Sequence, residues 1–198
     1  AIHSAGMAKI GSQGIEQMRK VNVEGTRNVA IATREAQARL VHVSSVNAIG
    51  IGRKDQPADE VTYWPQPLHV PYSITKQEAE QAVQEEIAQG LDAVIVNPGY
   101  MLGPWDWKPS SGRMLLEICG RFIPAAPWGG HSMCDVRDAV AGMIAAAEKG
   151  KTGERYILAG HNLSFFETWR MFTRLCGGTG PFVPLGPLNR MLLCAAAD

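Results

Sequence analysis

The chain has 198 residues, 45% of them hydrophobic, so it can bury one sizeable core and carry a small appendage. Its 19 basic residues balance its 19 acidic residues, which leaves no excess charge to attract nucleic acid or an acidic membrane surface. No apolar run approaches the length of a membrane span. We therefore expect a globular protein with no membrane span and no nucleic-acid partner.

The cysteines and histidines show no metal-binding pattern. The four cysteines form no C-x-x-C pair, and the five histidines lack the short spacings of zinc ligands. Scattered cysteines favour reduced thiols and a cytoplasmic location, and no metal is expected. The residues concerned are Cys119, Cys134, Cys176 and Cys194, with His3, His42, His69, His131 and His161.

The first part of the chain has the pattern of a strand, a helix and a second strand. Residues 1–6 are typical of a buried strand that ends in a turn of small residues. An apolar helical pattern runs from Val21 to Ala36, and we interpret the amide of Asn22 within it as facing solvent or bending the helix. Residues 40–45 are rich in β-branched side chains, which predicts a parallel strand buried on both faces.

A helix that begins at Pro71 is predicted in the middle of the chain. Proline suits the first helical turn, and Gly90 is a plausible stop. Tyr72 and Lys76 stand one turn apart on one face. That face continues through apolar positions, and most of the glutamates are expected elsewhere on the helix. The apolar positions are Ala79, Val83 and Ile87, and the glutamates are Glu78, Glu80 and Glu85.

A lysine aligned with the buried face of a helix needs a partner or a task. The alternative is an ordinary amphipathic pair, in which Lys76 extends past the ring of Tyr72 to water. The flanking sequence favours a task, because a serine pair closes the preceding strand and an Asn-Pro-Gly turn at 97–99 closes the following one.

The order of elements is strand, helix, strand, helix, strand, with a strand at 91–96 and a loop rich in glycine and proline over 46–70. This order predicts an α/β fold with a doubly wound parallel sheet. Ligands of such sheets bind beyond the carboxyl ends of the strands. We therefore expect Ser44, Ser45, the helix of Tyr72 and the turn at 97–99 to converge on one site.

After Pro98 the sequence becomes rich in aromatic residues, glycine and proline, which suits a substrate pocket. An alternative remains open, in which the tryptophans fill the core of a small subdomain. The elements expected here are a helix over 135–149, a strand over 155–159, a helix over 163–175 capped by Asn162 or Ser164, and a helix from Pro187 to the end.

These segments together resemble the extended short-chain dehydrogenase/reductases of the NAD-dependent epimerase/dehydratase family. Within it the chain is most similar to the dihydroflavonol 4-reductase-like proteins and the hopanoid-associated sugar epimerases. Each motif is weak alone, but their order along the chain is specific. The matching segments are 2–6, 22–28, 43–45, Tyr72 with Lys76, 96–99 followed by Gly103-Pro104, 135–139 and 153–158.

The resemblance implies roles for three side chains. Tyr72 would be the general acid and base that exchanges a proton with the substrate oxygen. Lys76 would lower the pKa of Tyr72 by placing a cation beside the phenolate, and would hold the ribose hydroxyls of the nicotinamide. Ser45, rather than Ser44, matches the catalytic serine that binds the reacting carbonyl or hydroxyl group.

The resemblance also implies a cofactor, NADP or NAD, and a small-molecule substrate. His3, Ser4 and Ala5 would line the dinucleotide groove, and Pro98 would border the nicotinamide. Residues 1–98, with return elements near 132–160, would form part of a Rossmann-like domain, and 99–131 with 161–198 the substrate-binding portion. The candidate substrate contacts are Asn47, Asn97, Tyr100 and Met101.

One departure from the family pattern is the missing glycine-rich segment that holds the pyrophosphate. At about 30 residues for each βαβ unit, roughly 60 residues or more would be absent. Either the sequence is part of a longer enzyme, which we favour, or the molecule is a fragment that is inactive.

The expected activity is reduction or oxidation of a small carbonyl or hydroxyl compound. Alternatives are a nucleotide-sugar epimerase or dehydratase, and a non-catalytic dinucleotide sensor or scaffold. A homodimer through the helices of Asn22 and Tyr72 is expected by resemblance alone.

Overall fold

The computed structural model describes residues 1–8, 14–52, 56–62, 70–119 and 121–186. The described chain divides into two compact units. The first unit consists of Ala1–Gly99 with Arg137–Leu158, and the second consists of Tyr100–Val136 with the chain from Ala159 onward. The tail from Pro187, which we expected to be helical, lies outside the described residues.

The first unit is built on a parallel sheet of strands in the order β1-β2-β3-β7. The strands are β1 (Ile2–His3), β2 (Leu40–Val43), β3 (Ala93–Pro98) and β7 (Arg155–Leu158). Every residue of β2 and β3 is buried, as a strand covered on both faces requires. The predicted parallel α/β sheet is confirmed. The prediction of a buried first strand is wrong, because β1 lies at the described edge of the sheet and Ile2 is 52% exposed.

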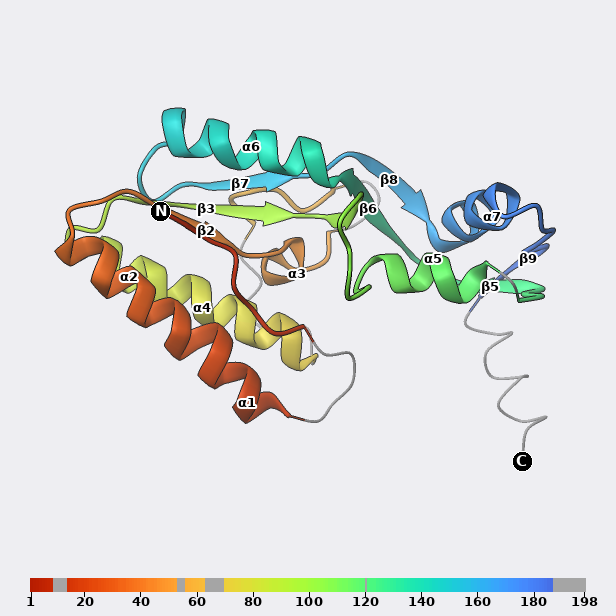
Figure 1. Cartoon of the computed structure of the whole chain (residues 1–198), viewed down its shortest axis with the longest axis horizontal. Coiled ribbons are helices and arrows are strands. Elements are labelled where there is room, and N and C mark those ends of the chain that lie inside the picture. Colours follow the sequence, from red (N-terminus) through yellow and green to blue (C-terminus); the bar gives the residue numbers. More distant parts are fainter. Residues whose placement is uncertain (9–13, 53–55, 63–69, 120, 187–198) are drawn as a thin grey trace. The chain divides into compact units, whose positions relative to one another are not determined.

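Helices cover both faces of this sheet, with α2 and α4 on one face and α6 on the other (Figure 1). A continuous helical stretch contains α1 (Ile15–Arg19), a π-helical turn (Lys20–Glu24) and α2 (Gly25–Glu35). The other helices of this unit are α3 (Val46–Ile49), α4 (Pro71–Ile87) and α6 (Val136–Lys149). The apolar core between the sheet and its helices is formed by Ala30, Leu40, Val83, Leu91, Ala93 and Ile95.

Helix α4 begins at Pro71 as predicted, and the chain turns at Gly90 with φ of +101°. Glu80 contradicts the expectation that it lies away from the buried face, because it is only 6% exposed, and Glu86, for which no expectation was stated, is 3% exposed. The reason is the width of the buried face: α4 contacts the sheet, α2 and the π-helical turn together. A stripe defined by apolar residues alone underestimates that face.

The segment expected to be a continuous loop over 46–70 contains the short helix α3. Its capping serine, Ser45, is extended, and its side chain accepts a hydrogen bond from the Asn47 N–H. A capping serine provides a local start signal. The signal was missed because glycines and prolines dominate the rest of the segment.

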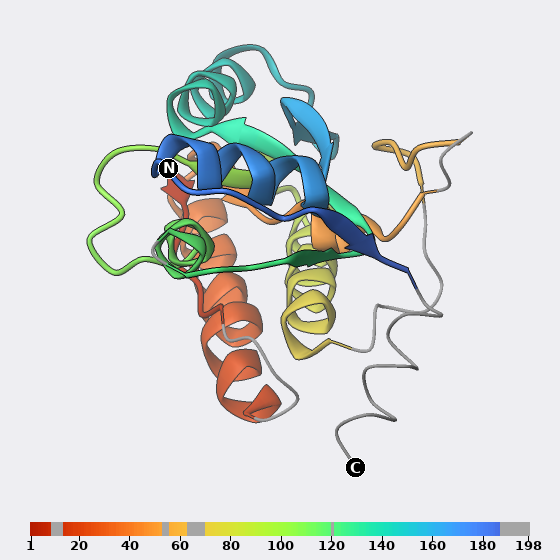
Figure 2. The same cartoon turned by 90° about the vertical axis from the view of Figure 1, so that its right-hand side faces the viewer.

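Within the described residues, the second unit contains two small sheets and the helices α5 and α7, which Figures 1 and 2 show from two directions. Helix α7 (Phe165–Leu175) is capped by Ser164 in a capping box with Glu167, so Ser164 and not Asn162 begins it. The remaining elements are β4 (Tyr100–Leu102), β6 (Gly130–Asp135) and β8 (His161–Ser164) in one sheet, β5 (Ala125–Pro127) and β9 (Val183–Leu185) in the other, and α5 (Gly112–Ile118).

Packing of α5 on α7 brings Cys119 and Cys176 together as a disulfide, with the Cα atoms 5.6 Å apart. The expectation of reduced thiols is therefore wrong for this pair. The two residues are 57 positions apart in sequence, and no spacing rule links them.

Trp105, Trp107 and Trp128 are 73 to 81% exposed, so these three do not fill a subdomain core. Within the described residues, none of the helices combines the length and apolar character that membrane crossing requires.

His42 in β2 predicts a dependence of stability on pH. It is 1% exposed, and burial, followed by the charge of Lys76, lowers its pKa to about 3. The unfolded chain then binds more protons below the ordinary pKa of 6.5, so stability is lost as the pH falls. For this group alone the loss between pH 7 and pH 5 is about 2 kcal/mol.

Urea unfolding at pH 7 and pH 5 measures this loss, with His42→Leu as the comparison. The variant lacks the buried imidazole and should lose about 2 kcal/mol less on acidification. An equal loss in both proteins would show that other groups carry the acid sensitivity.

Candidate active site

Lys76 is the centre of the site. Its side chain is 6% exposed, and its Nζ donates a 3.0 Å hydrogen bond to the carbonyl oxygen of Val43, the last residue of β2. Burial lowers the pKa of Lys76 to about 8, and the negative charge of Glu80 opposes this effect. The lysine is therefore mostly charged at pH 7 and begins to lose its proton just above it. The alternative in which Lys76 extends to water is wrong.

Ser45 and Tyr72 face each other from two elements. Ser45 stands just after β2 as the cap of α3, and Tyr72 is in the first turn of α4. Burial raises the pKa of Tyr72, and its interaction with the Ser45 hydroxyl lowers it by less. The chain by itself therefore keeps the phenol protonated. It does not produce the lowering of the Tyr72 pKa that we expected from Lys76.

The interpretation of Asn22 as a solvent-facing amide is wrong, because the residue is only 2% exposed. It lies in the π-helical turn, a distortion that is frequent at functional sites. Its Oδ1 accepts a hydrogen bond from the Met7 N–H at 2.7 Å, and its Nδ2 donates to the Met7 carbonyl oxygen and to Thr75 Oγ1, both at 3.0 Å. Asn22 therefore joins the turn after β1 to α4, one residue before Lys76.

The turn after β1 leaves space beside the Lys76 ammonium group, where a dinucleotide could bind. A Cβ atom added to Gly6 would lie 3.4 Å from both Lys76 Nζ and Asn22 Oδ1, so a side chain there would fill the space beside the ammonium group. Among the described residues, the Val43 carbonyl takes one of the three ammonium hydrogens. The group therefore keeps donors for the hydroxyls of a ribose. Ser4 and Ala5 in the same turn are exposed, and His3 Nε2 lies 3.2 Å from Thr26 Oγ1.

Asn97 is fully buried at the end of β3, where it is bound by the protein itself. Its Nδ2 donates to the Ser45 carbonyl oxygen at 2.9 Å and to Glu80 Oε1 at 2.6 Å. Its Oδ1 is buried without a hydrogen-bond partner among the described residues. Asn47, in contrast, has an exposed side chain, and Pro98 is buried as the last residue of β3. Substrate contact by Asn97 and Asn47, and the place of Pro98 beside the nicotinamide, stay predictions.

Tyr100 and Met101 belong to β4 of the second unit, and their role in substrate binding also stays a prediction. The ring of Tyr100 stacks on His131 with a centroid distance of 4.7 Å, and its hydroxyl donates a hydrogen bond to the Ser111 carbonyl oxygen. Burial, followed by the charge of Asp106, raises the pKa of Tyr100 to about 12. This tyrosine is therefore a proton donor in hydrogen bonds rather than a base.

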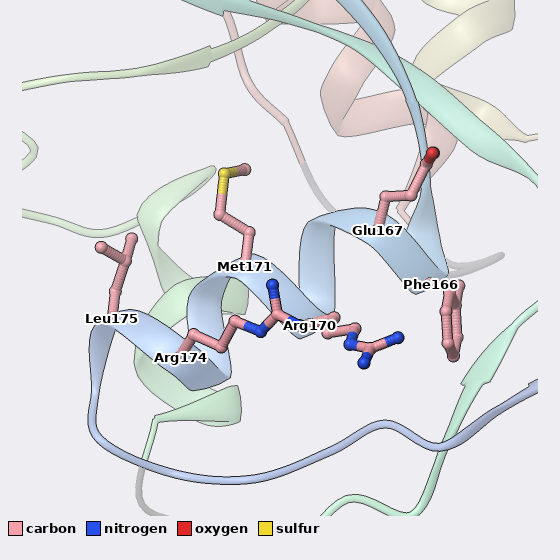
Figure 3. A pocket seen from close by; sticks show the side chains of 6 residues that line it. All are labelled: Phe166, Glu167, Arg170, Met171, Arg174 and Leu175. Carbon is pink, nitrogen blue, oxygen red and sulfur yellow. The ribbon is translucent and has the colours of Figure 1, made fainter.

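A separate hollow lies on α7 in the second unit, and no residue predicted from the sequence lines it (Figure 3). Figure 3 shows Arg170 and Arg174 extending from the helix beside this hollow. Its lining residues are Phe166, Glu167, Arg170, Met171, Arg174 and Leu175. Among the described residues there is no group of three or more histidine, cysteine or acidic side chains that could hold a metal ion.

Comparison with known proteins identifies the family of the chain. The profile of the NAD dependent epimerase/dehydratase family matches residues 1–159. A dihydroflavonol 4-reductase-like protein of Synechocystis sp. is 40% identical over 82% of the chain, and sterol demethylase protein B of Methylococcus capsulatus is 34% identical over 93%. The crystal structure of gox2253 matches with a TM-score of 0.85 and 35% identity over 99% of the chain.

The chain spans 49% and 57% of the lengths of the two sequence relatives, and 63% of gox2253. The matched region includes the sheet of the first unit, the π-helical turn and the helix of Tyr72 and Lys76. The chain belongs to the NAD dependent epimerase/dehydratase family.

Proposed function

We propose that the protein is an NAD(P)-dependent oxidoreductase that interconverts a carbonyl and a hydroxyl group on a small molecule. The observation that carries the proposal is the placement of a buried ammonium group, Lys76, beside the carboxyl ends of parallel strands, with Ser45 and Tyr72 facing each other there. Ligands of such sheets bind beyond those strand ends. Family membership and the reductase-like relative support the same reaction class.

Three side chains would handle the proton. Ser45 Oγ accepts the Asn47 N–H and keeps its own hydrogen to donate to the substrate oxygen. Tyr72 would give its phenolic proton to that oxygen during reduction and take it back during oxidation. Lys76 would hold the cofactor ribose and stabilise the tyrosinate that forms. A bound nicotinamide supplies or accepts the hydride at the carbonyl carbon.

A nucleotide-sugar epimerase or dehydratase is the second candidate, because the family description covers both reaction types. The same serine, tyrosine and lysine would serve that chemistry. The homodimer, the cytoplasmic location and the preference for NAD or NADP stay predictions. Absence of turnover in the unmodified protein, despite binding of the dinucleotide, would favour the third alternative, a dinucleotide sensor or scaffold.

Tyr72→Phe tests the proton-transfer role. The variant keeps the half-buried ring at the start of α4 but loses the hydroxyl, so turnover should fall by at least about 100-fold. Binding of NADH or NADPH, measured by calorimetry, should change little. Turnover is followed as NADPH or NADH oxidation with a dihydroflavonol as the carbonyl substrate. Activity close to that of the unmodified protein would refute the assignment of Tyr72.

The pKa of Lys76 near 8 predicts how cofactor binding depends on pH. If the charged ammonium holds the ribose, affinity for NADPH or NADH should fall as the pH rises through about 8, by up to about tenfold per pH unit above it. Lys76→Met should bind weakly at every pH and lack this dependence. The measurement is fluorescence titration of the reduced dinucleotide from pH 6 to 10. A flat profile in the unmodified protein would contradict the role of Lys76.

A further inference from the structure

Glu80 is a buried carboxylate that the proposed chemistry does not use. It follows Lys76 by one helical turn and is 6% exposed. Burial raises the pKa of this carboxyl group, and hydrogen bonding with its neighbours opposes the rise. Burying a carboxylate costs several kcal/mol before its partners compensate, and an apolar side chain at such a position often stabilises a protein as well or better. Stability alone is therefore a weak reason for a glutamate here.

Glu80 is linked to Ser45 through the side chain of Asn97. Glu80 Oε1 accepts a 2.6 Å hydrogen bond from Asn97 Nδ2, and the same amide nitrogen donates at 2.9 Å to the Ser45 carbonyl oxygen. Both hydrogens of one amide group are thereby used. The carboxylate fixes which way the Asn97 amide points, and the amide holds the main chain at the residue whose hydroxyl faces Tyr72.

The charged groups that act on Glu80 come from two elements, α4 and β7. Lys76 lies on α4 itself, and Arg155 Nη1 of β7 is 3.6 Å from Glu80 Oε2. Arg155 also donates at 3.2 Å to the carbonyl oxygen of Thr62, so its guanidinium group is shared. Lys76 in turn faces His42 of β2 and His3 of β1, whose pKa values are lowered by burial, so both are neutral at pH 7. Among the described residues, Glu80 is the anion that acts on Lys76.

We propose that Glu80 is a positioning residue for proton transfer at Tyr72, because it holds Asn97 against the Ser45 main chain and places a negative charge beside Lys76. The proposal rests on the function proposed above. It makes two separable claims, one about the geometry of Ser45 and one about the charge of Lys76. Each claim has its own variant.

Glu86 supplies a matched control on the same helix. It is 3% exposed and pairs with Arg34 Nε at 3.1 Å, so it is also a buried glutamate with an arginine partner. It follows Glu80 by six residues, and it is not among the groups that act on Lys76. A merely structural role for Glu80 predicts that Glu80→Gln and Glu86→Gln behave alike.

The charge claim is tested by NMR titration of the Lys76 side chain in the protein without cofactor. The midpoint should lie near pH 8 in the unmodified protein and in Glu86→Gln, and at a lower pH in Glu80→Gln. Turnover of a dihydroflavonol with NADPH should fall about tenfold or more in Glu80→Gln. Glu86→Gln should keep the turnover of the unmodified protein even where its melting temperature falls.

The geometric claim is tested by Asn97→Ala, which releases the Ser45 main chain but keeps the carboxylate. Its kcat should fall while the KM for NADPH stays unchanged, and the Lys76 midpoint should move less than in Glu80→Gln, because the carboxylate remains. If Glu80→Gln does not fold, Glu80→Asp replaces it: its shorter side chain keeps the charge but cannot reach Asn97 in the same way. Reduced kcat with a midpoint near 8 would then support the proposal, and unchanged kcat would overturn it.

The outcomes separate this proposal from the proposed function. An unchanged Lys76 midpoint and unchanged turnover in Glu80→Gln, or equal effects in Glu86→Gln, would overturn the positioning role. Full turnover in Tyr72→Phe, or none in the unmodified protein, would instead remove the proposed function. The Lys76 titration needs no substrate and no cofactor, so the charge claim would still be decided.

Discussion

The burial of the Lys76 ammonium group is the constraint on which the first unit depends. A lysine with a pKa near 8 instead of 10.5 carries a cost of about 3 kcal/mol when it is held charged at pH 7. The carbonyl oxygen of Val43 offsets part of the cost of removing the group from water. The end of β2, the start of α4 and the turn after β1 must therefore stay in register with one another, because each contributes to the surroundings of one charge.

Two buried amides maintain that register. Asn22 uses its oxygen and its amide hydrogens to join the turn after β1 to Thr75 of α4. Asn97 uses its amide hydrogens to join β3, the Ser45 main chain and Glu80. Removing one partner of a buried hydrogen bond leaves the other unsatisfied, which costs about 1 to 3 kcal/mol. The hydrogen bonds of Asn22 and Asn97 thus hold the site in place, and the loss of either amide would destabilise it.

The parts of this arrangement that the sequence predicts are those with a local signal. Pro71 marks a helix start, and the spacing of Tyr72 and Lys76 places both on one face. The buried strands β2 and β3 appear as β-branched runs, and their parallel order follows from the alternation of elements. Resemblance to a family added the roles, which no spacing could supply.

The parts that were missed depend on partners far away in the chain. The partners of Asn22 are Met7 and Thr75, so helix periodicity could not distinguish a buried amide from an exposed one. Cys119 and Cys176 meet only because α5 packs on α7. Glu80 did have a local signal, since it extends the line of Tyr72 and Lys76 by one more turn. It was passed over because a glutamate is expected to face water.

The protonation states in the site bear on the direction of the chemistry. Burial keeps the pKa of Tyr72 above its ordinary value, so the phenol carries its proton at neutral pH. An acid of this kind is ready to protonate the oxygen of a carbonyl that receives a hydride. Oxidation of a hydroxyl, the first step in epimerisation through a ketone, needs the tyrosinate instead. The chain would then have to lower that pKa from above its ordinary value to near neutrality. A cation at Lys76 is the group available on α4 to do so, and Glu80 beside it helps to keep that cation charged. The ligand-free site therefore holds Tyr72 in the protonated form that reduction of a carbonyl uses, and oxidation of a hydroxyl would require its surroundings to change.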